Sequence, residues 1–176
     1  SRDRILTTHT GSLPRNEALS DLLVRREEGE AIDPQRLGGE MDAAVRYVVE
    51  KQAAAGIDIA NDGEQQRVGF QTYVPQRMDG FAGESNRRRG RDFEAFPQLL
   101  EMFLRRFPKR SRMQNAPEAR AELRYLDTAP ILEETERLKR HVKAAGVFAE
   151  SFMTAPSPGI ISTTMLNGYY DSQEAY

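Results

Sequence analysis

The feature that most constrains this fold is a helical repeat of apolar residues that runs directly into a short strand. Apolar residues recur three and four positions apart after Gly39, and Gly56 stands where helices commonly end. This spacing predicts a helix over about residues 40–55, with a single buried face made of Met41, Ala44, Val45, Val48, Val49 and Gln52. Residues 57–60 then predict a short strand that stops at the turn-forming residues 61–63.

A strand is also expected before this helix. Residues 4–9 are rich in strand-forming side chains, and Gly11 and Pro14 end the run. A polar stretch then leads to Gly39. The first 63 residues therefore predict a strand–helix–strand unit, which is the repeating element of parallel α/β folds.

The second half of the chain continues the alternation. Residues 121–126 predict a third strand, and a helix with Pro130 in its first turn follows and is closed by Gly146. Residues 147–152 predict a fourth strand. The buried face of the helix is expected to consist of Ile131, Leu132, Thr135, Leu138 and Val142.

Three segments are less regular. Residues 65–118 are rich in Gly, Pro and Arg, and we expect an insertion or an elaborated loop there. Within it, residues 93–107 predict a helix with Pro97 in the first turn. Near the end of the chain, a Pro- and Gly-rich loop is expected around residues 156–159, and residues 172–176 resemble the start of another helix.

Two architectures fit this order of elements. A doubly wound sheet usually carries a Gly-rich phosphate loop after its first strand, and here that position holds Thr10 to Arg15 with one glycine. The other candidate is a (β/α)₈ barrel, which needs about 250 residues. With 176 residues, the chain is predicted to hold about the first four β/α units of such a barrel. The remaining units would then come from elsewhere in the protein or from a partner chain.

Composition excludes several classes of protein. The net charge of −2 disfavours a nucleic-acid-binding protein, and no stretch approaches the roughly 20 apolar residues of a membrane helix. The apolar run near the start is too short for a signal-peptide core. The chain has no cysteine, so neither disulfides nor thiolate metal ligands are expected within it, and a cytoplasmic location is expected.

Basic residues gather in one part of the chain. From Arg87 to Arg124 there are 11 Lys or Arg against 5 Asp or Glu, and the densest part is the Arg87–Arg91 run. A solvated loop, a contact to the anionic tail of a substrate and RNA binding are all compatible with such a run. RNA binding is the least favoured, because no aromatic residues are interleaved for base stacking.

Polar residues follow the first two predicted strands where each strand ends. Residues 8–12 follow the first strand and residues 61–65 follow the second. In parallel α/β folds, ligands bind over these carboxyl ends. The loop from Thr10 through Gly11 to Ser12 offers backbone N–H groups and hydroxyls suited to a carboxylate, and Glu64 offers a charge suited to an ammonium group. Both loops also have the composition of ordinary turns, so this pattern alone leaves the two interpretations open.

The same two segments carry a resemblance to a known family. Residues 7–15 (Thr-Thr-His-Thr-Gly-Ser-Leu-Pro-Arg) and residues 56–65 (Gly-Ile-Asp-Ile-Ala-Asn-Asp-Gly-Glu-Gln) resemble the start of the catalytic domain of cobalamin-independent methionine synthases. Their short relatives include zinc-dependent epoxyalkane:coenzyme M transferases. Residues 154–158 and 168–170 resemble the same group more loosely. The resemblance therefore spans residues 1–176 as the N-terminal half of such a barrel.

This resemblance implies a zinc-dependent thiol S-methyltransferase that binds homocysteine or a similar thiol. By position, the residues implied to bind substrate are Thr10, Gly11 and Ser12 for the carboxylate, Glu64 for the ammonium group, and Asp62, Asn61 and His9 as further rim residues. The family's zinc ligands, a His-x-Cys pair and a later Cys, belong to the second half of the barrel. No catalytic or metal-binding residue is therefore expected in this chain, which by itself would be inactive, and His141 is expected to face solvent.

Several alternatives stay open at this point. The donor implied is a methyltetrahydrofolate or a methylated corrinoid protein, although an epoxide or an aryl methyl ether would also suit the family. The expected partners are a small-molecule thiol and the C-terminal half of the barrel, on the same or a second polypeptide, with no nucleic acid and no membrane. Other candidates are an S-alkyltransferase acting on coenzyme M, a non-catalytic subunit, and a small-molecule-binding protein with a flavodoxin-like sheet.

Overall fold

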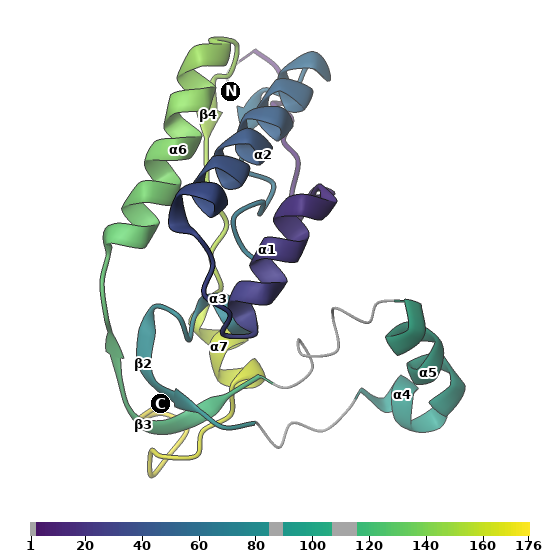
Figure 1. The fold of residues 1–176 in the computed structure, drawn as a ribbon, viewed down its shortest axis with the longest axis vertical. Coiled ribbons are helices and arrows are strands. Elements are labelled where there is room, and N and C mark those ends of the chain that lie inside the picture. The colour runs from purple at the N-terminus through teal and green to yellow at the C-terminus, as the bar shows by residue number, and fades with distance from the viewer. Residues whose placement is uncertain (1–2, 85–89, 107–115) are drawn as a thin grey trace. The chain divides into compact units, whose positions relative to one another are not determined.

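The chain divides into two compact units. The computed structural model describes residues 3–84, 90–106 and 116–176 (Figure 1). The first unit comprises Ser1–Val68 and Asp127–Ala155, and the second comprises Gly69–Leu126 and Pro156–Tyr176. Of the Arg87–Arg91 run, residues 87–89 lie outside the described residues, so its predicted contact to a substrate tail stays a prediction.

Three extended segments of the first unit run parallel to one another. Thr8 pairs with Ile59 of β1 (Ile59–Ala60), and β1 pairs with β4 (Glu150–Ser151) in the register Ile59 to Glu150. The pairing extends beyond these strands, because the N–H of Phe152 donates to the carbonyl of Ala60 at 3.0 Å. The parallel strands predicted at residues 4–9, 57–60 and 147–152 are therefore confirmed in type, although each ladder is shorter than expected.

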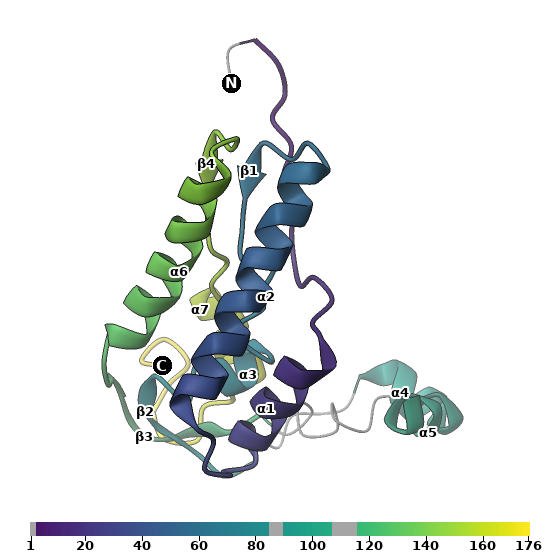
Figure 2. The ribbon, with the colours of Figure 1, turned by 45° about the horizontal axis from the view of Figure 1, so that its top comes forward.

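Two helices pack on one another beside these strands. Helix α2 (Pro34–Ala54) is capped by Asp33, whose side chain accepts from the N–H of Gln35, and α6 is Ala129–Ala145. Val45 and Val49 of α2 form a buried cluster with Leu138 of α6. Figures 1 and 2 both show α2 and α6 lying side by side, and Figure 2 shows β1 and β4 behind them. The helix predicted from Gly39 is thus confirmed and starts earlier, at Pro34.

A further helix of the first unit was not predicted. Helix α1 (Glu17–Glu27) begins at Asn16, whose side chain accepts from the N–H of Leu19 at 2.7 Å. Its buried side chains pack against the first half of α2 in a cluster of Leu19, Leu22, Leu23, Leu37, Met41 and Ala44. The polar stretch between the first strand and α2 therefore contributes part of the core.

The buried face predicted for α6 is partly wrong. Leu138 is buried, but Leu132 is 60% exposed. Glu134 and Arg137 are buried instead, each at 6% exposure. His141, expected to face solvent, has a side chain only 11% exposed, and its Nε2 lies 2.9 Å from Oδ1 of Asp42 on α2. Gly146 closes the helix in the left-handed conformation, as predicted.

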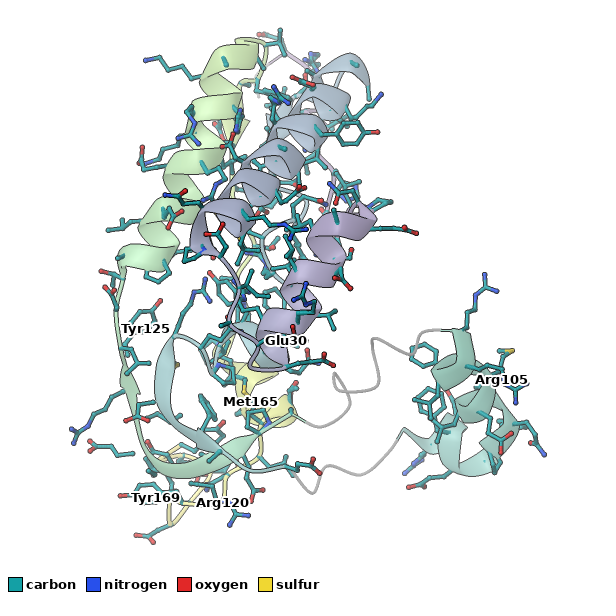
Figure 3. All side chains as sticks on the ribbon, viewed as in Figure 1. Glu30, Arg105, Arg120, Tyr125, Met165 and Tyr169 are labelled. Atoms are coloured by element: carbon teal, nitrogen blue, oxygen red, sulfur yellow. The ribbon has the colours of Figure 1, made fainter. Side chains whose placement is uncertain are left out.

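The second unit contains an antiparallel pair of strands. Strand β2 (Met78–Ala82) pairs with β3 (Glu118–Tyr125), with an irregularity between Asp79 and Phe81. The third strand predicted at residues 121–126 therefore exists, but it is antiparallel to β2 and is not part of the parallel sheet. A small core packs beside this pair and includes Val74, Ala116 and Met165, the last of which is labelled in Figure 3.

The helices of the second unit are short. They are α3 (Phe70–Tyr73), α4 (Arg91–Ala95), α5 (Pro97–Arg106) and α7 (Pro158–Thr164). The single helix predicted at residues 93–107 is divided at Phe96, because the residue before a proline disfavours helical geometry. Figure 3 labels Arg105 in the last turn of α5.

Two predictions near the C-terminus are wrong. The proline-rich loop expected around residues 156–159 begins α7, where Ser157 accepts from the N–H of Ile160 and Pro158 occupies the first turn. Residues 172–176 form turns and bends and no helix. A proline and a glycine near a helix N-terminus are compatible with helix once the preceding serine caps it.

The described residues belong to the α/β class. They hold three parallel extended segments and two covering helices in the first unit, which is fewer than the four strands expected for a half-barrel. A (β/α)₈ barrel needs further strands and belongs to the proposal made below. Among the helices of the described ranges, none combines the length and hydropathy that crossing a bilayer requires.

Candidate functional site

The loops that follow the first two parallel segments are bound tightly to each other. Asn61 donates from Nδ2 to the carbonyl of His9 at 2.6 Å, and the N–H of Leu13 donates to the carbonyl of Gly63 at 2.9 Å. Gln65 also donates from Nε2 to the carbonyl of Leu13 at 2.9 Å. Residues 9–15 and 61–67 therefore form one structure at the carboxyl end of β1, which we call the rim.

The second rim loop contains two consecutive residues with a positive φ, Gly63 and Glu64. The side chain of Asn61 accepts from the N–H of Gly63 at 2.8 Å, and that of Asp62 accepts from the N–H of Glu64 at 3.1 Å. Gly63 has φ 57° and Glu64 has φ 56°. Within the described ranges, Glu64 is the one non-glycine residue with a positive φ, a conformation that costs an L-residue about 1–2 kcal/mol. Such strain is commonly found where a side chain must point in a required direction.

Arg15 holds this strained loop from the first rim loop. Its guanidinium donates to three backbone carbonyls, those of Glu64 at 2.8 Å, Gln65 at 3.0 Å and Arg67 at 2.6 Å. A guanidinium has five donors in a fixed plane, so one side chain satisfies several carbonyls that the turn leaves without helix or sheet partners. The last residue of the Thr-Gly-Ser-Leu-Pro-Arg motif therefore determines the shape of the second loop.

The carboxylate of Glu64 is held by hydroxyl groups from two other parts of the chain. Oε2 accepts from Ser12 at 2.5 Å, and Oε1 accepts from Thr154 at 3.1 Å. Ser12 lies after the first parallel segment and Thr154 lies after β4. Over the described part of the chain, Glu64 makes no ion pair. Its negative charge is therefore oriented by neutral donors and not neutralised.

Behind the rim lies a layer of buried polar side chains. Asp62 is 1% exposed and forms an ion pair at 3.7 Å with Arg67, which is 2% exposed. Gln66 donates to Oδ2 of Asp62 at 3.3 Å and accepts a hydrogen bond from Arg137 of α6. Arg67 in turn donates from Nη2 to the hydroxyl of Thr154 at 2.7 Å. This layer connects α6 to the loop that carries Glu64.

The structure brings some of the predicted site residues together and separates others. Ser12 and Glu64 are in direct contact, and Thr10 and Gly11 precede Ser12 in the same loop, where Thr10 is exposed and Gly11 has φ 96°. His9 is half-buried, with Nε2 3.1 Å from the carbonyl of Gly11. The side chains of Asn61 and Asp62 are directed to the interior, where they shape the turn.

Three residues of the site had no predicted role: Arg15, Arg67 and Thr154. Arg15 and Thr154 lie in segments that resemble the family, so the resemblance marked their positions without giving them a role. Arg67 follows the second motif by two residues, and a buried arginine beside a buried carboxylate leaves no periodic signal in a sequence. The contacts of Arg15 and Thr154 join residues 49 to 90 positions apart, which no local pattern contains.

The described residues do not provide a zinc site. They contain no group of three or more His, Cys, Asp or Glu side chains that could hold a metal ion, and the chain has no cysteine. The rim carboxylates have other partners, since Asp62 is paired with Arg67 and Glu64 accepts from two hydroxyls.

Comparison with known proteins finds a similarity over the first half of the chain. A family model described as the catalytic domain of cobalamin-independent synthase matches residues 5–88, which include both rim loops. No curated protein and no solved structure matches the chain. Residues 5–88 of this chain are therefore similar to the catalytic domain of cobalamin-independent synthases.

Proposed function

We propose that this chain supplies the amino-acid-binding rim of a methionine-synthase-like thiol S-methyltransferase. The acceptor would be homocysteine or a similar thiol, with zinc held by residues outside this chain. The methyl group would come from a methyltetrahydrofolate or a methylated corrinoid protein. The similarity of residues 5–88 to the synthase catalytic domain supports a methyltransferase in general terms.

The observation that carries this proposal is the set of hydrogen-bond partners of the Glu64 carboxylate. Its carboxylate is oriented by Ser12 and Thr154, yet within the described residues it has no cation partner. An oriented carboxylate without a cation is well suited to bind a primary ammonium group through charge-assisted hydrogen bonds. The adjacent loop at Thr10 and Gly11 offers backbone N–H groups for the carboxylate of the same amino acid.

The same observation separates the acceptors that the family allows. Homocysteine carries both an ammonium and a carboxylate, whereas coenzyme M carries a sulfonate and no ammonium group. An S-alkyltransferase acting on coenzyme M would leave Glu64 without a ligand partner and next to an anionic substrate. The rim therefore favours an amino-acid thiol.

The remaining strands of the barrel are part of the proposal. Within the described residues, the parallel sheet has three members and its two outer edges are unpaired. Unpaired edges expose backbone N–H and C=O groups that readily pair with further strands. We propose that the C-terminal half of the barrel, on the same or a second polypeptide, supplies these strands together with the zinc ligands.

The test is binding of amino acids by the purified protein, measured by isothermal titration calorimetry. L-methionine, the product of the proposed reaction, is the first ligand, and 4-(methylthio)butanoate, which lacks only the amino group, is the comparison. Glu64→Gln is expected to weaken methionine binding by about 10- to 100-fold, because a hydrogen bond to a charged group contributes roughly 1.5–3 kcal/mol. The analogue should bind equally to both proteins.

Glu50→Gln is the matched control for this experiment. Glu50 is exposed on α2, so the same change of carboxylate to amide there should leave both affinities unaltered. An unchanged affinity of Glu64→Gln for methionine would remove Glu64 from the site. Tight binding of coenzyme M, independent of Glu64, would favour the alkyltransferase instead.

A further inference from the structure

The hydroxyl group of Thr154 occupies a central place between two charged side chains of the first unit. Its Oγ1 lies 2.7 Å from Nη2 of Arg67 and 3.1 Å from Oε1 of Glu64. Thr154 comes three residues after β4, so it enters the rim from the third parallel segment. Neither rim loop contains it.

The direction of each hydrogen bond at Thr154 follows from chemistry. A guanidinium can only donate, so the hydroxyl oxygen of Thr154 accepts from Arg67. A hydroxyl has one proton, and a carboxylate is an acceptor, so that proton goes to Glu64. Arg67 is 2% exposed and is also paired with Asp62. Because this arginine is fixed, the hydroxyl of Thr154 has one favourable orientation.

The carboxylate of Glu64 is thereby held at both oxygens. Ser12 occupies one acceptor position of Oε2, and Thr154 occupies one of Oε1. A carboxylate has about four lone-pair positions, so two remain for a ligand. Two hydroxyl anchors fix the plane of the group, which a single anchor would leave free to rotate about the last side-chain bond.

We propose that Thr154, oriented by Arg67, is a positioning residue that aims the carboxylate of Glu64 at the amino group of the substrate and so contributes to selection of amine-bearing thiols. This inference rests on the proposed function, since it concerns the same rim. It adds a residue from the third parallel segment to the two loops that the family resemblance identified. Its specific consequence is that the Thr154 hydroxyl affects binding only of ligands that carry an amino group.

The test compares variants of Thr154 with the two ligands that differ in the amino group. Thr154→Val keeps the shape of the side chain and removes the hydroxyl. We expect it to weaken binding of L-methionine by about tenfold and to leave binding of 4-(methylthio)butanoate unchanged. Thr154→Ser, which retains a hydroxyl, should restore methionine binding to within about threefold of the wild type.

Two further variants keep the experiment decisive. Thr135→Val is the matched control, because the hydroxyl of Thr135 bonds to the carbonyl of Leu132 within α6, far along the chain from the rim loops. Thr135→Val should leave the affinity for both ligands unchanged. Thr154→Ala replaces Thr154→Val should the latter fail to fold, because a smaller side chain cannot overfill the site.

The possible results distinguish the positioning role of Thr154 from the proposed function. Equal weakening of both ligands by Thr154→Val would overturn the positioning role and indicate a packing role. A loss of methionine binding in Glu64→Gln without one in Thr154→Val would overturn this inference and leave the proposed function intact. Equal affinity of the wild-type protein for methionine and its analogue would overturn both.

Discussion

The two ends of β1 carry carboxylates in opposite situations. Asp58 precedes the strand, and its two oxygens accept from the guanidinium of Arg4, with a further bond from the N–H of Thr7 at 2.8 Å. Glu64 follows the strand, and its oxygens accept from two hydroxyls and, among the described residues, from no cation. Asp58 is paired with a cation, whereas Glu64, over the described residues, is held by hydroxyl groups alone.

Under the proposed function, this difference places a stabilising carboxylate before the strand and a ligand-binding carboxylate after it. The hydrogen bond from Arg4, the N–H of Thr7 and the charge of Arg4 hold the pKa of Asp58 well below its ordinary value, against the opposing effect of desolvation. Asp58 thus fixes the N-terminal segment to β1. In parallel α/β folds, the carboxyl end of the strands carries the ligand site and the opposite end serves stability. The contrast between Asp58 and Glu64 follows this rule.

The largest expected effect concerns the buried pair beneath the rim. Arg67→Met removes the cation from Asp62 while keeping most of the side-chain volume. A buried carboxylate that loses its partner typically costs about 3–5 kcal/mol, so we expect the free energy of unfolding to fall by that amount. Urea denaturation followed by circular dichroism measures it. Arg46→Met, at an exposed position of α2, is the control and should change the value by less than about 0.5 kcal/mol.

A small effect of Arg67→Met would break the comparison in one respect. It would mean that the carboxylate of Asp62 becomes hydrated or protonated when Arg67 is absent. Substitutions beneath the rim would then cost as little stability as substitutions at an exposed surface. The layer of Asp62, Gln66 and Arg137 would then not be a rigid support for Glu64.

The second expected effect compares two left-handed glycines on either side of β1. Gly56 has φ 72° and open space where a Cβ would stand, whereas at Gly63, with φ 57°, a Cβ would lie 2.9 Å from Cδ1 and 3.0 Å from Cβ of Leu13. Gly56→Ala should cost about 1 kcal/mol, from the left-handed backbone alone. Gly63→Ala should cost about 2–3 kcal/mol, because Leu13 must also move.

Thermal or urea unfolding of the two alanine variants measures this difference. Equal losses of unfolding free energy in Gly56→Ala and Gly63→Ala would show that the two rim loops are not tightly packed, because Leu13 could then move aside at little cost. A larger loss at Gly63, together with weaker methionine binding in that variant alone, would sharpen the distinction between the two ends.

The sequence contains enough information to predict the parallel part of the fold. The helical spacing before Gly56 and the strand formers after it are local signals, and they gave α2 and β1 correctly. The signals for α1 were also present, since Asn16 is a good N-cap and Leu19, Leu22 and Leu23 have helical spacing. Local signals in the sequence are therefore sufficient to predict α1 as well.

Other features depend on partners far along the chain. Arg137 is buried because it meets Gln66, 71 positions away, and the predicted apolar face at Leu132 is exposed. The direction of β3 depends on β2, about 40 residues earlier, and alternation alone does not distinguish parallel from antiparallel pairing. At the rim, Ser12 and Glu64 were identified from the sequence, whereas the contact that Thr154 makes requires knowing which strand lies beside β1.

The smallest expected effect tests the two carboxylates directly by the same chemical change. Asp58→Asn removes the charge that binds Arg4, and Glu64→Gln removes a charge that has no cation partner among the described residues. Arg4 is 62% exposed, and exposed ion pairs contribute little, so the loss of stability in Asp58→Asn should be modest. Glu64→Gln should leave the free energy of unfolding within about 0.5 kcal/mol of the wild type. Asp58→Asn should in turn leave methionine binding unchanged.

The pH dependence of these variants identifies the origin of the effect. The pKa of Asp58 is lower in the folded state than its ordinary value of about 4, so the unfolded chain binds the proton more readily. The stabilisation is therefore complete above about pH 4 and is lost as the pH falls below that value toward the folded pKa. The difference in unfolding free energy between the wild type and Asp58→Asn should accordingly be constant at neutral pH and shrink in acid. A difference for Asp58→Asn that persists unchanged into acid would assign its effect to lost hydrogen-bond geometry and not to charge, and the two ends of β1 would then differ only in packing.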